Sequence, residues 1–332
     1  MIDSTKTVMI TGGTGSLGKA LINRLKSVGC KLIVFSRDEG KQALIYGRDS
    51  AVECVIGDIR DYDKLNITIQ RHRPDYIIHT AALKRIDDME FYPDECVKTN
   101  INGSENVARA ALENNVKKCI LVSTDKACQP VNVYGSSKFI AERIFTNYDY
   151  NSRSTIFASV RYGNVIASRG SFIPLWIDMV KAGEILKVTS EDMTRFLFTL
   201  EDAVDTVLGA LNHALGGEVF VPQIDSYTLP SCIKAVEKIM NENALMNVKQ
   251  TIDYEVIGLR PGEKLHEDML AKTELPYTYS IPDINLLQIR PQYTHKTYQD
   301  WELYDGPEFN SALYVSEDID KLSKLIKEGL RQ

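Results

Sequence analysis

The chain has 332 residues, of which 44% are hydrophobic and 25% charged, as is usual for a soluble globular protein with one large domain and a smaller lobe. Its formal net charge of −6 excludes a general binding surface for nucleic acid or for anionic membranes. The first residues lack the basic segment and long apolar run of a signal peptide, and no apolar stretch approaches the ~20 residues of a membrane helix. We therefore expect a cytoplasmic protein.

The first half of the chain alternates short apolar runs with helical patterns. The runs are rich in β-branched residues, which is typical of strands buried on both faces; they span 7–11, 31–36, 51–57, 75–81, 118–123 and 155–163. Helical periodicity is found at 17–28, 102–114 and 136–148. Strand–helix–strand repetition predicts the α/β class, with a doubly wound, parallel Rossmann sheet.

After residue 163 the alternation is less regular. We predict a loop and helix within 169–184, a strand at 217–223 and a helix at 228–243. The last helix is predicted to begin at an N-cap Ser316; its apolar face consists of Ile319, Leu322, Ile326 and Leu330. We expect a cofactor-binding Rossmann domain at 1–163, with segments near 190–222 returning to it. An interleaved, mainly substrate-binding lobe is expected at 164–332.

A glycine-rich loop, TGGTGSLGKAL, follows the first predicted strand and opens the first helix. Such glycines allow a tight turn and close approach of the backbone to a pyrophosphate, which faces the free N–H groups of the helix. The strand before the loop and the helix after it favour this interpretation over a plain glycine-rich turn. The predicted cofactor contacts in the loop are Thr11, Gly12, Gly15, Ser16, Leu17 and Gly18.

The end of the second predicted strand reads FSRDE and selects the cofactor. Arg37, with Ser36 beside it, could form a forked pair with the 2′-phosphate of NADP, so we predict tightly bound NADP. The alternative is a solvated Arg37, with Asp38 binding the ribose of NAD. In this fold, Asp58 and Ile59 after the third strand are placed near the adenine ring.

Tyr134 and Lys138 are four residues apart and share a helix face, just after a strand that ends in Ser-Thr. Lys138 is expected to lower the pKa of the Tyr134 phenol and to hold the nicotinamide ribose. Tyr134 then takes a proton from a sugar hydroxyl while hydride leaves the same carbon.

The six cysteines form no C-x-x-C pair, and no Cys/His cluster has the spacing of zinc ligands, so we expect free, mostly buried thiols and no metal. Cys128 lies beside Asp125 and Lys126, but no histidine nearby in the sequence would activate it as a nucleophile.

The chain resembles the extended short-chain dehydrogenase/reductases, and more narrowly the inverting UDP-N-acetylglucosamine 4,6-dehydratases of bacterial surface-sugar pathways. The matching segments cover nearly the whole chain; they are TGGTGSLG, SRDE, GDIRD, AALKR, KTNINGSENV, STDKA, YGSSK, RYGNVIASRGSFIP, MTRF and GLRPGEKLHE. Retaining relatives, which dehydrate glucose nucleotides, carry Asp-Glu after the threonine, where this chain has Asp125-Lys126.

This resemblance implies UDP-N-acetylglucosamine as substrate and a reaction that needs more than hydride transfer. Oxidation at C4 acidifies the C5 proton; Lys126 is the candidate base for that proton and Asp125 the candidate acid for the departing C6 hydroxyl. Thr124 would hydrogen-bond the C4 oxygen. The alternative is that Asp125 and Lys126 form a surface salt bridge on a loop.

Further contacts are implied by the same resemblance. Those to the cofactor are Ala81, Ala82, Lys84 and Asn100. Those to the sugar nucleotide are Lys84, Asn164, Arg169, Arg260 for the diphosphate and Glu263 for the uridine ribose. A homo-oligomer, either a dimer or a hexamer, is also expected.

Three other functions remain open from the sequence. A UDP-sugar 4-epimerase would not need the Asp125-Lys126 pair. A retaining dehydratase would differ in C5 stereochemistry. A non-catalytic dinucleotide sensor would be expected to lack an intact Tyr134-Lys138 pair.

Overall fold

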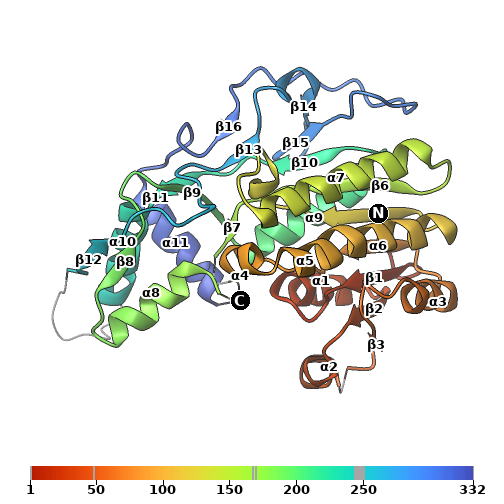
Figure 1. Ribbon diagram of the computed structural model, residues 1–332, viewed down its shortest axis with the longest axis horizontal. Helices are drawn as coiled ribbons and strands as arrows, with labels where there is room; N and C mark the ends of the chain where they lie inside the picture. The colour runs from red at the N-terminus through yellow and green to blue at the C-terminus, as the bar shows by residue number, and fades with distance from the viewer. Residues whose placement is uncertain (1, 48, 167, 169, 243–250, 332) are drawn as a thin grey trace.

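The central feature of the computed structural model is a large sheet with helices on both faces (Figure 1). The structure describes residues 2–331 except 48, 167, 169 and 243–250. Over these residues the main sheet has nine strands. In spatial order they are β14 (Thr278–Ser280), β15 (Leu286–Ile289), β10 (Val219–Pro222), β6 (Ile156–Val160), β5 (Lys118–Val122), β4 (Tyr76–His79), β1 (Thr7–Thr11), β2 (Lys31–Ser36) and β3 (Val52–Ile56).

The seven strands from β10 to β3 run parallel, as the predicted doubly wound sheet requires. Successive residues of β1 face opposite sides of the sheet, since Val8 and Ile10 pack in one core cluster and Met9 in another. All three side chains are fully buried, which explains why these strands read as continuous apolar runs.

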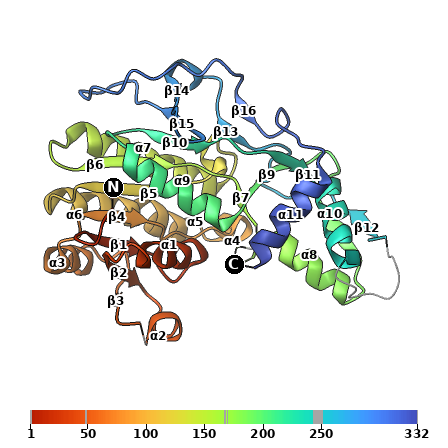
Figure 2. The same ribbon diagram turned by 180° about the vertical axis from the view of Figure 1, so that it is seen from behind.

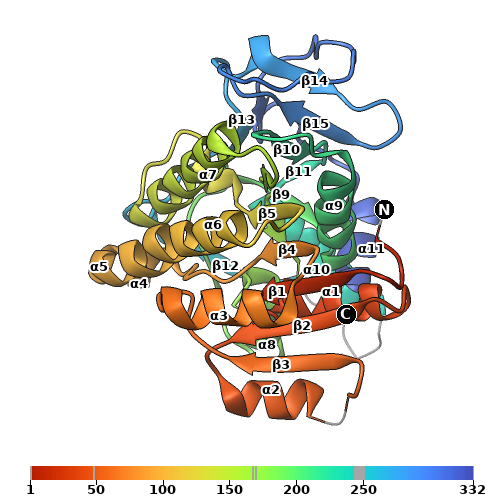
Figure 3. The same ribbon diagram turned by 90° about the vertical axis from the view of Figure 1, so that its right-hand side faces the viewer.

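Helices cover the two faces of this sheet (Figure 3). On one face lie α1 (Ser16–Lys26) and α9 (Leu200–His213). On the other face lie α3 (Tyr62–His72), α6 (Gly103–Glu113) and α7 (Val133–Asn151). The connecting elements along the first half are α2 (Glu39–Tyr46), α4 (Ile86–Phe91), α5 (Pro93–Cys96) and the π-helical turn η1 (Val97–Asn102).

Two further strands extend the sheet beyond β10: β15 pairs antiparallel with β10, and β14 pairs antiparallel with β15. Strand β10 confirms the strand predicted at 217–223. Leu287 of β15 lies opposite Val221 of β10, and both are fully buried. The runs TYS and LLQI of β14 and β15 are too short for their periodicity to identify them as strands.

A smaller lobe lies at one end of the sheet and has its own apolar core (Figures 1 and 2). Its helices are α8 (Phe172–Lys181), α10 (Leu229–Glu242) and α11 (Ile319–Leu330). Three short strands of the second half form one sheet; they are β7 (Asn164–Val165), β9 (Thr194–Phe198) and β11 (Ser226–Thr228). Four others form two separate pairs, β8 (Leu186–Val188) with β12 (Tyr254–Val256) and β13 (Asp268–Leu270) with β16 (Phe309–Asn310). A 3₁₀ turn, η3 (Leu275–Tyr277), precedes β14.

The last helix differs from its prediction in two details. Its N-cap is Asp318 rather than Ser316, because the Asp318 carboxylate accepts a hydrogen bond from the backbone N–H of Lys321 at 2.8 Å. Leu322 is fully buried as predicted, whereas Leu330, the last residue of the helix, is 41% exposed.

Helix α7 begins at Val133, three residues before the predicted start at Ser136. The cause is Asn132, whose side chain accepts a hydrogen bond from the Gly135 N–H at 2.7 Å and so caps the helix early. Tyr134 therefore lies in the first turn of the helix that also carries Lys138.

Among the described helices, none is both long enough and apolar enough to cross a membrane. No group of three or more His, Cys, Asp or Glu side chains within the described chain is arranged to hold a metal ion. All six cysteines are free, and five of them are buried; Cys54 on β3 is exposed.

Candidate active site

The glycine-rich loop between β1 and α1 forms a cradle, which would be filled if its glycines carried side chains. Gly12 has a φ of +69°, and a Cβ at this position would lie 2.8 Å from the backbone of Ala81. A Cβ at Gly18 would lie 2.5 Å from the Cα of Gly13, so α1 packs directly against the loop. Gly15 at the N-cap leaves the first N–H groups of α1 without a side-chain cap. These features fit the diphosphate of a dinucleotide.

The other predicted cofactor contacts in this region have different surroundings. Thr11 is fully buried, and its hydroxyl lies 2.7 Å from His79 Nδ1, so it ties β1 to β4. Of the remaining positions, Ile59 is buried, Ser16, Leu17 and Ala81 are partly buried, and Ala82 is exposed.

Arg37 and Asp38 follow β2, and they differ in how closely neighbouring residues already bind them. The Arg37 side chain is 54% exposed, and its Nη1 lies 3.5 Å from Asp58 Oδ2. Asp38 instead caps α2 by accepting a hydrogen bond from the Lys41 N–H, and it also pairs with the Lys41 ammonium. Ser36 is buried at the end of the strand. Arg37 is therefore more open to a new anionic partner than Asp38 is to a ribose.

Asn100 in η1 stabilises the surroundings of the site through hydrogen bonds. Its side chain exchanges two hydrogen bonds with the backbone of Leu83, at 2.8 and 2.9 Å, and donates a third to the Ser137 hydroxyl at 3.0 Å. Asn100 is fully buried, so these bonds fix the loop that carries the exposed Lys84 against α7. A role in supporting the site fits this geometry better than direct contact with a cofactor.

The turn formed by Thr124, Asp125 and Lys126, which we name the catalytic turn after the role predicted for it, follows β5 after Ser123 and leads into the 3₁₀ turn η2 (Asp125–Ala127). One oxygen of Asp125, Oδ1, accepts hydrogen bonds from Thr124 Oγ1 at 2.8 Å, from Lys126 N at 2.9 Å and from Lys126 Nζ at 3.0 Å. The other oxygen, Oδ2, is buried without a hydrogen-bond partner among the described residues.

Burial also rules out the surface salt bridge as the structural role of this pair. The side chains of Asp125 and Lys126 are only 1% and 16% exposed. An unpaired carboxylate oxygen in the interior costs free energy unless something satisfies it, so Asp125 Oδ2 is a candidate position for contact with a ligand atom.

Tyr134 and Lys138 both lie on α7 next to the catalytic turn, and their pKa values shift in opposite directions. Burial raises the pKa of Tyr134 to about 12, opposed by the Lys126 ammonium and by a hydrogen bond with Thr124. Burial lowers the pKa of Lys138 to about 8, opposed by the Glu142 carboxylate. The cation that lowers the Tyr134 pKa is therefore Lys126 and not, as the sequence suggested, Lys138.

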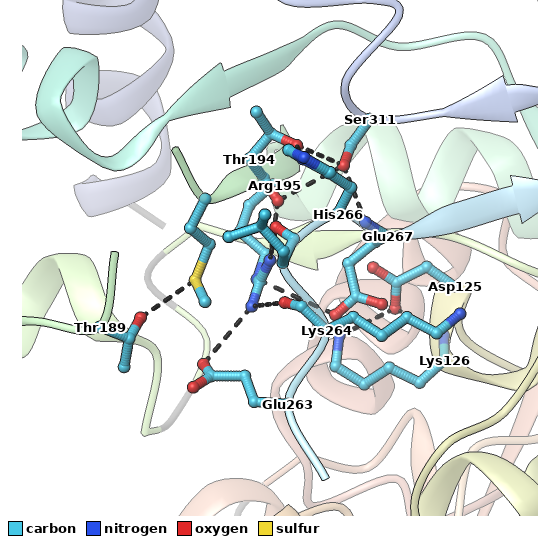
Figure 4. Close-up of polar contacts among 12 residues, drawn as sticks. Asp125, Lys126, Thr189, Thr194, Arg195, Glu263, Lys264, His266, Glu267 and Ser311 are labelled. Atoms are coloured by element: carbon cyan, nitrogen blue, oxygen red, sulfur yellow. Dashed lines mark hydrogen bonds and ion pairs between the residues drawn. The ribbon is translucent and has the colours of Figure 1, made fainter. Parts of the chain in front are cut away.

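Two buried residues that the sequence analysis did not single out complete the centre (Figure 4). Glu267 Oε1 lies 3.1 Å from Lys126 Nζ, and Arg195 Nε lies 3.9 Å from the same oxygen. Both belong to segments that match the family, MTRF and GLRPGEKLHE. Spacing alone could not separate them from their neighbours, because the contact joins positions far apart in the chain.

The pKa of Lys126 is raised by this arrangement. Burial acts to lower it, but the carboxylates of Asp125 and Glu267 outweigh that effect. Lys126 is therefore an ammonium at neutral pH, held between two buried carboxylates.

The predicted sugar-nucleotide contacts lie at different depths around this centre. Asn164 on β7 has a buried Oδ1 with no hydrogen-bond partner in the described part of the chain. Glu263 Oε1 lies 3.4 Å from Arg195 Nη2, whereas Arg260 is 56% exposed, with Nη1 3.7 Å from Asp87 Oδ2. Arg169 lies outside the described residues.

The loop that carries Glu263 and Glu267 is also tied to the catalytic turn through Lys264. The Lys264 ammonium donates to the carbonyl of Cys128 at 2.8 Å and to Asp268 Oδ2 at 3.1 Å. Burial raises the pKa of the Cys128 thiol, which disfavours the thiolate that a nucleophile needs.

A doubly wound sheet, a glycine cradle after β1 and a Tyr-x-x-x-Lys pair on α7 define the extended short-chain dehydrogenase/reductase class. The chain belongs to the polysaccharide biosynthesis protein family, whose model matches residues 8–288.

Three relatives illustrate the range of this family. The chain is 39% identical to a Campylobacter jejuni protein named UDP-N-acetylglucosamine 4,6-dehydratase (inverting), over 82% of this chain and 80% of the relative. It is 37% identical to a Rickettsia conorii protein named UDP-glucose 4-epimerase, over 96% of this chain and 89% of the relative. The crystal structure of Pen from Bacillus thuringiensis superposes with a TM-score of 0.90 at 32% identity, covering all of both chains.

Proposed function

We propose that this protein is a UDP-N-acetylglucosamine 4,6-dehydratase that inverts C5. The observation that carries the proposal is the buried pair Asp125 and Lys126 beside Tyr134, with one carboxylate oxygen left unpaired. A redox step alone needs only the tyrosine and Lys138, whereas elimination of water also needs a base and an acid. The name of the C. jejuni relative supports the same reaction.

In the first step, the Tyr134 phenol passes its proton through the Thr124 hydroxyl to the Asp125 carboxylate, and the resulting phenolate removes the proton of the C4 hydroxyl as C4 is oxidised. A nicotinamide dinucleotide bound in the glycine cradle would supply the hydride chemistry at C4 and C6. Thr124, within hydrogen-bond reach of Tyr134, holds the C4 oxygen. Lys138 holds the ribose of the dinucleotide from the next turn of α7.

The second step is the elimination that the 4-ketone makes feasible. Lys126 removes the acidified C5 proton. Asp125, now carrying the proton that it received from Tyr134 through the Thr124 hydroxyl, gives a proton to the C6 oxygen as it leaves. C5 is then planar and is reprotonated from the opposite face. The flexible stem of Lys126 can reach that face, whereas the glutamate of retaining relatives returns the proton to its own side.

The lobe within 164–332 supplies the contacts to the sugar nucleotide in this proposal. Asn164 offers its unpaired Oδ1 to the sugar, and Glu263 binds the uridine ribose. Arg260 and Arg169 contact the nucleotide, with Arg260 pairing with the diphosphate.

The reaction predicts a product that has lost one water and carries solvent hydrogen at C5. We expect UDP-2-acetamido-2,6-dideoxy-β-L-arabino-hexos-4-ulose from UDP-N-acetylglucosamine, with deuterium at C5 when the reaction is run in D₂O. Mass spectrometry followed by NMR of early product, before the ketone epimerises in solution, measures both features. A D-xylo configuration at the earliest time point would favour a retaining dehydratase.

A UDP-sugar 4-epimerase is the second candidate, because the R. conorii relative of that name covers more of this chain than the dehydratase does, 96% against 82%. The same mass spectrum separates the two reactions. An epimerase gives an isomer of unchanged mass, and its chemistry leaves no role for the Asp125-Lys126 pair.

The cofactor in this proposal is NADP, selected by Arg37. Arg37→Asp is expected to weaken NADP binding by about 10- to 100-fold relative to NAD, as follows from loss of a charge-assisted hydrogen bond to the 2′-phosphate. Titration of cofactor-free protein with each dinucleotide measures the ratio. Arg71→Asp, which changes an exposed arginine on α3, is the matched control. Equal weakening of both cofactors would reject the assignment.

A further inference from the structure

Glu267 is the second ion-pair partner of Lys126, and the family resemblance assigned it no role. Glu267 Oε1 lies 3.1 Å from Lys126 Nζ, and the Glu267 side chain is 2% exposed. It comes from the segment just before β13, about 140 residues after the catalytic turn. Figure 4 shows the side chains of Glu267 and Asp125 next to the Lys126 side chain. The contact therefore joins the end of β5 to the second half of the chain.

A base must have a lone pair, and Lys126 as an ammonium has none. Proton loss to bulk water is disfavoured, because the side chain is only 16% exposed and lies between two carboxylates. Removal of the C5 proton by Lys126 thus requires that a neighbouring group first accept the ammonium proton. In the part of the chain that the structure describes, two carboxylates lie within hydrogen-bond distance of Nζ, those of Asp125 and Glu267.

The hydrogen bonds of these two carboxylates decide between them. Asp125 Oδ1 accepts three donors, and hydrogen bonds to a carboxylate stabilise its charged form. Glu267 Oε1 has Lys126 Nζ as its close partner, since Arg195 Nε lies farther away at 3.9 Å. Glu267 Oε2 is buried with no hydrogen-bond partner among the described residues. A proton transferred from Lys126 to Glu267 therefore displaces fewer hydrogen bonds than a proton transferred to Asp125 Oδ1.

Resting on the proposed dehydration, we propose that Glu267 is a positioning residue that holds Lys126 against the catalytic turn and accepts its ammonium proton during the reaction. One N–H bond at Nζ breaks and an O–H bond at Oε1 forms, which converts the ion pair into a neutral amine and a neutral carboxylic acid. The lone pair on Nζ then takes the C5 proton. After the proton returns to C5, Glu267 gives its proton back and the resting pair is restored.

The experiment compares the pH dependence of kcat in wild type and Glu267→Gln. An amide oxygen can accept the Lys126 hydrogen bond but cannot take the proton. We expect kcat of the variant to fall about 100-fold at neutral pH, with KM nearly unchanged. Removing one carboxylate makes Lys126 lose its proton more readily, so kcat of the variant should rise towards that of wild type as the pH increases. Glu267→Asp, which keeps a carboxylate, should recover part of the neutral-pH rate.

A purely structural role for Glu267 predicts a different result. It would lower kcat by the same factor at every pH, and Glu267→Asp would give no rescue; either finding overturns the proposal. Glu263→Gln is the matched control from the same loop, since Glu263 contacts Arg195 but not Lys126. As a predicted nucleotide contact, its loss should raise KM without the pH-dependent recovery of kcat.

A second measurement separates this proposal from the proposed function. The NMR signal of the Lys126 side chain, assigned with Lys126→Arg, can be titrated in the protein without substrate. We expect it to titrate at lower pH in Glu267→Gln than in wild type, and an unchanged titration overturns the pairing even if dehydration is confirmed. If wild type makes no dehydrated product, the proposed reaction fails, and the role of Glu267 in it fails too, whatever the titration shows.

Discussion

Lys126→Ala is expected to lower kcat for dehydration of UDP-N-acetylglucosamine by about 1,000-fold or more, within the range for loss of a general base. Tyr134 and Lys138 remain in place on α7, so cofactor and substrate should still bind. Deuterium exchange at C5 should be lost together with product formation, because both need the same proton transfer. Single-turnover mass spectrometry in D₂O measures product and exchange in one experiment.

Lys126→Arg is the matched control for this prediction. A guanidinium keeps the positive charge and can still pair with Asp125 and Glu267, but it does not give up its proton in proteins. If Lys126 acts as a base, the arginine variant should be nearly as inactive as the alanine variant while being as stable as wild type. Wild-type turnover in Lys126→Arg would mean that Lys126 acts only through its charge.

The sequence predicted the parts of the site whose residues lie close together along the chain. The glycine cradle, the catalytic turn and the Tyr134-Lys138 pair each lie within a short segment beside a strand, so spacing and strand order are enough to place them. Glu267 and Arg195 could not be placed in this way. They reach Lys126 through strand β9 and the loop before β13, and only the fold brings these segments together.

The same distinction holds for the fold. The parallel strands were predicted because each is a continuous apolar run buried on both faces. The start of α7 was missed by three residues because it depends on one side chain, Asn132, whose amide oxygen caps the helix. The cation acting on Tyr134 was also misjudged, since helix periodicity indicates Lys138, while the turn after β5 brings Lys126 close in space.

Arg161→Ala is expected to lower the free energy of unfolding by about 3 to 5 kcal/mol, the usual cost of breaking a buried ion pair from one side. Arg161 is 1% exposed; it lies 2.8 Å from Glu142 on α7 and 2.8 Å from Glu274, the residue before η3. The variant would leave Glu142, which is fully buried, with the more distant Arg143 guanidinium at 4.0 Å as its cationic partner among the described residues. Equilibrium unfolding in urea measures the loss.

The pH dependence of this difference tests its cause. Burial acts to raise the pKa of Glu274, but Arg161 holds it below the ordinary value of 4.5. A carboxyl with a lowered pKa contributes stability above its unfolded pKa and loses it as the pH falls through the folded pKa. The difference between wild type and Arg161→Ala should therefore be largest near neutral pH and shrink below about pH 4.5.

Arg109→Ala, which breaks an exposed pair with Glu113, should change stability little at any pH. A constant loss for Arg161→Ala across this range would mean that lost packing, and not the ion pair, explains the effect.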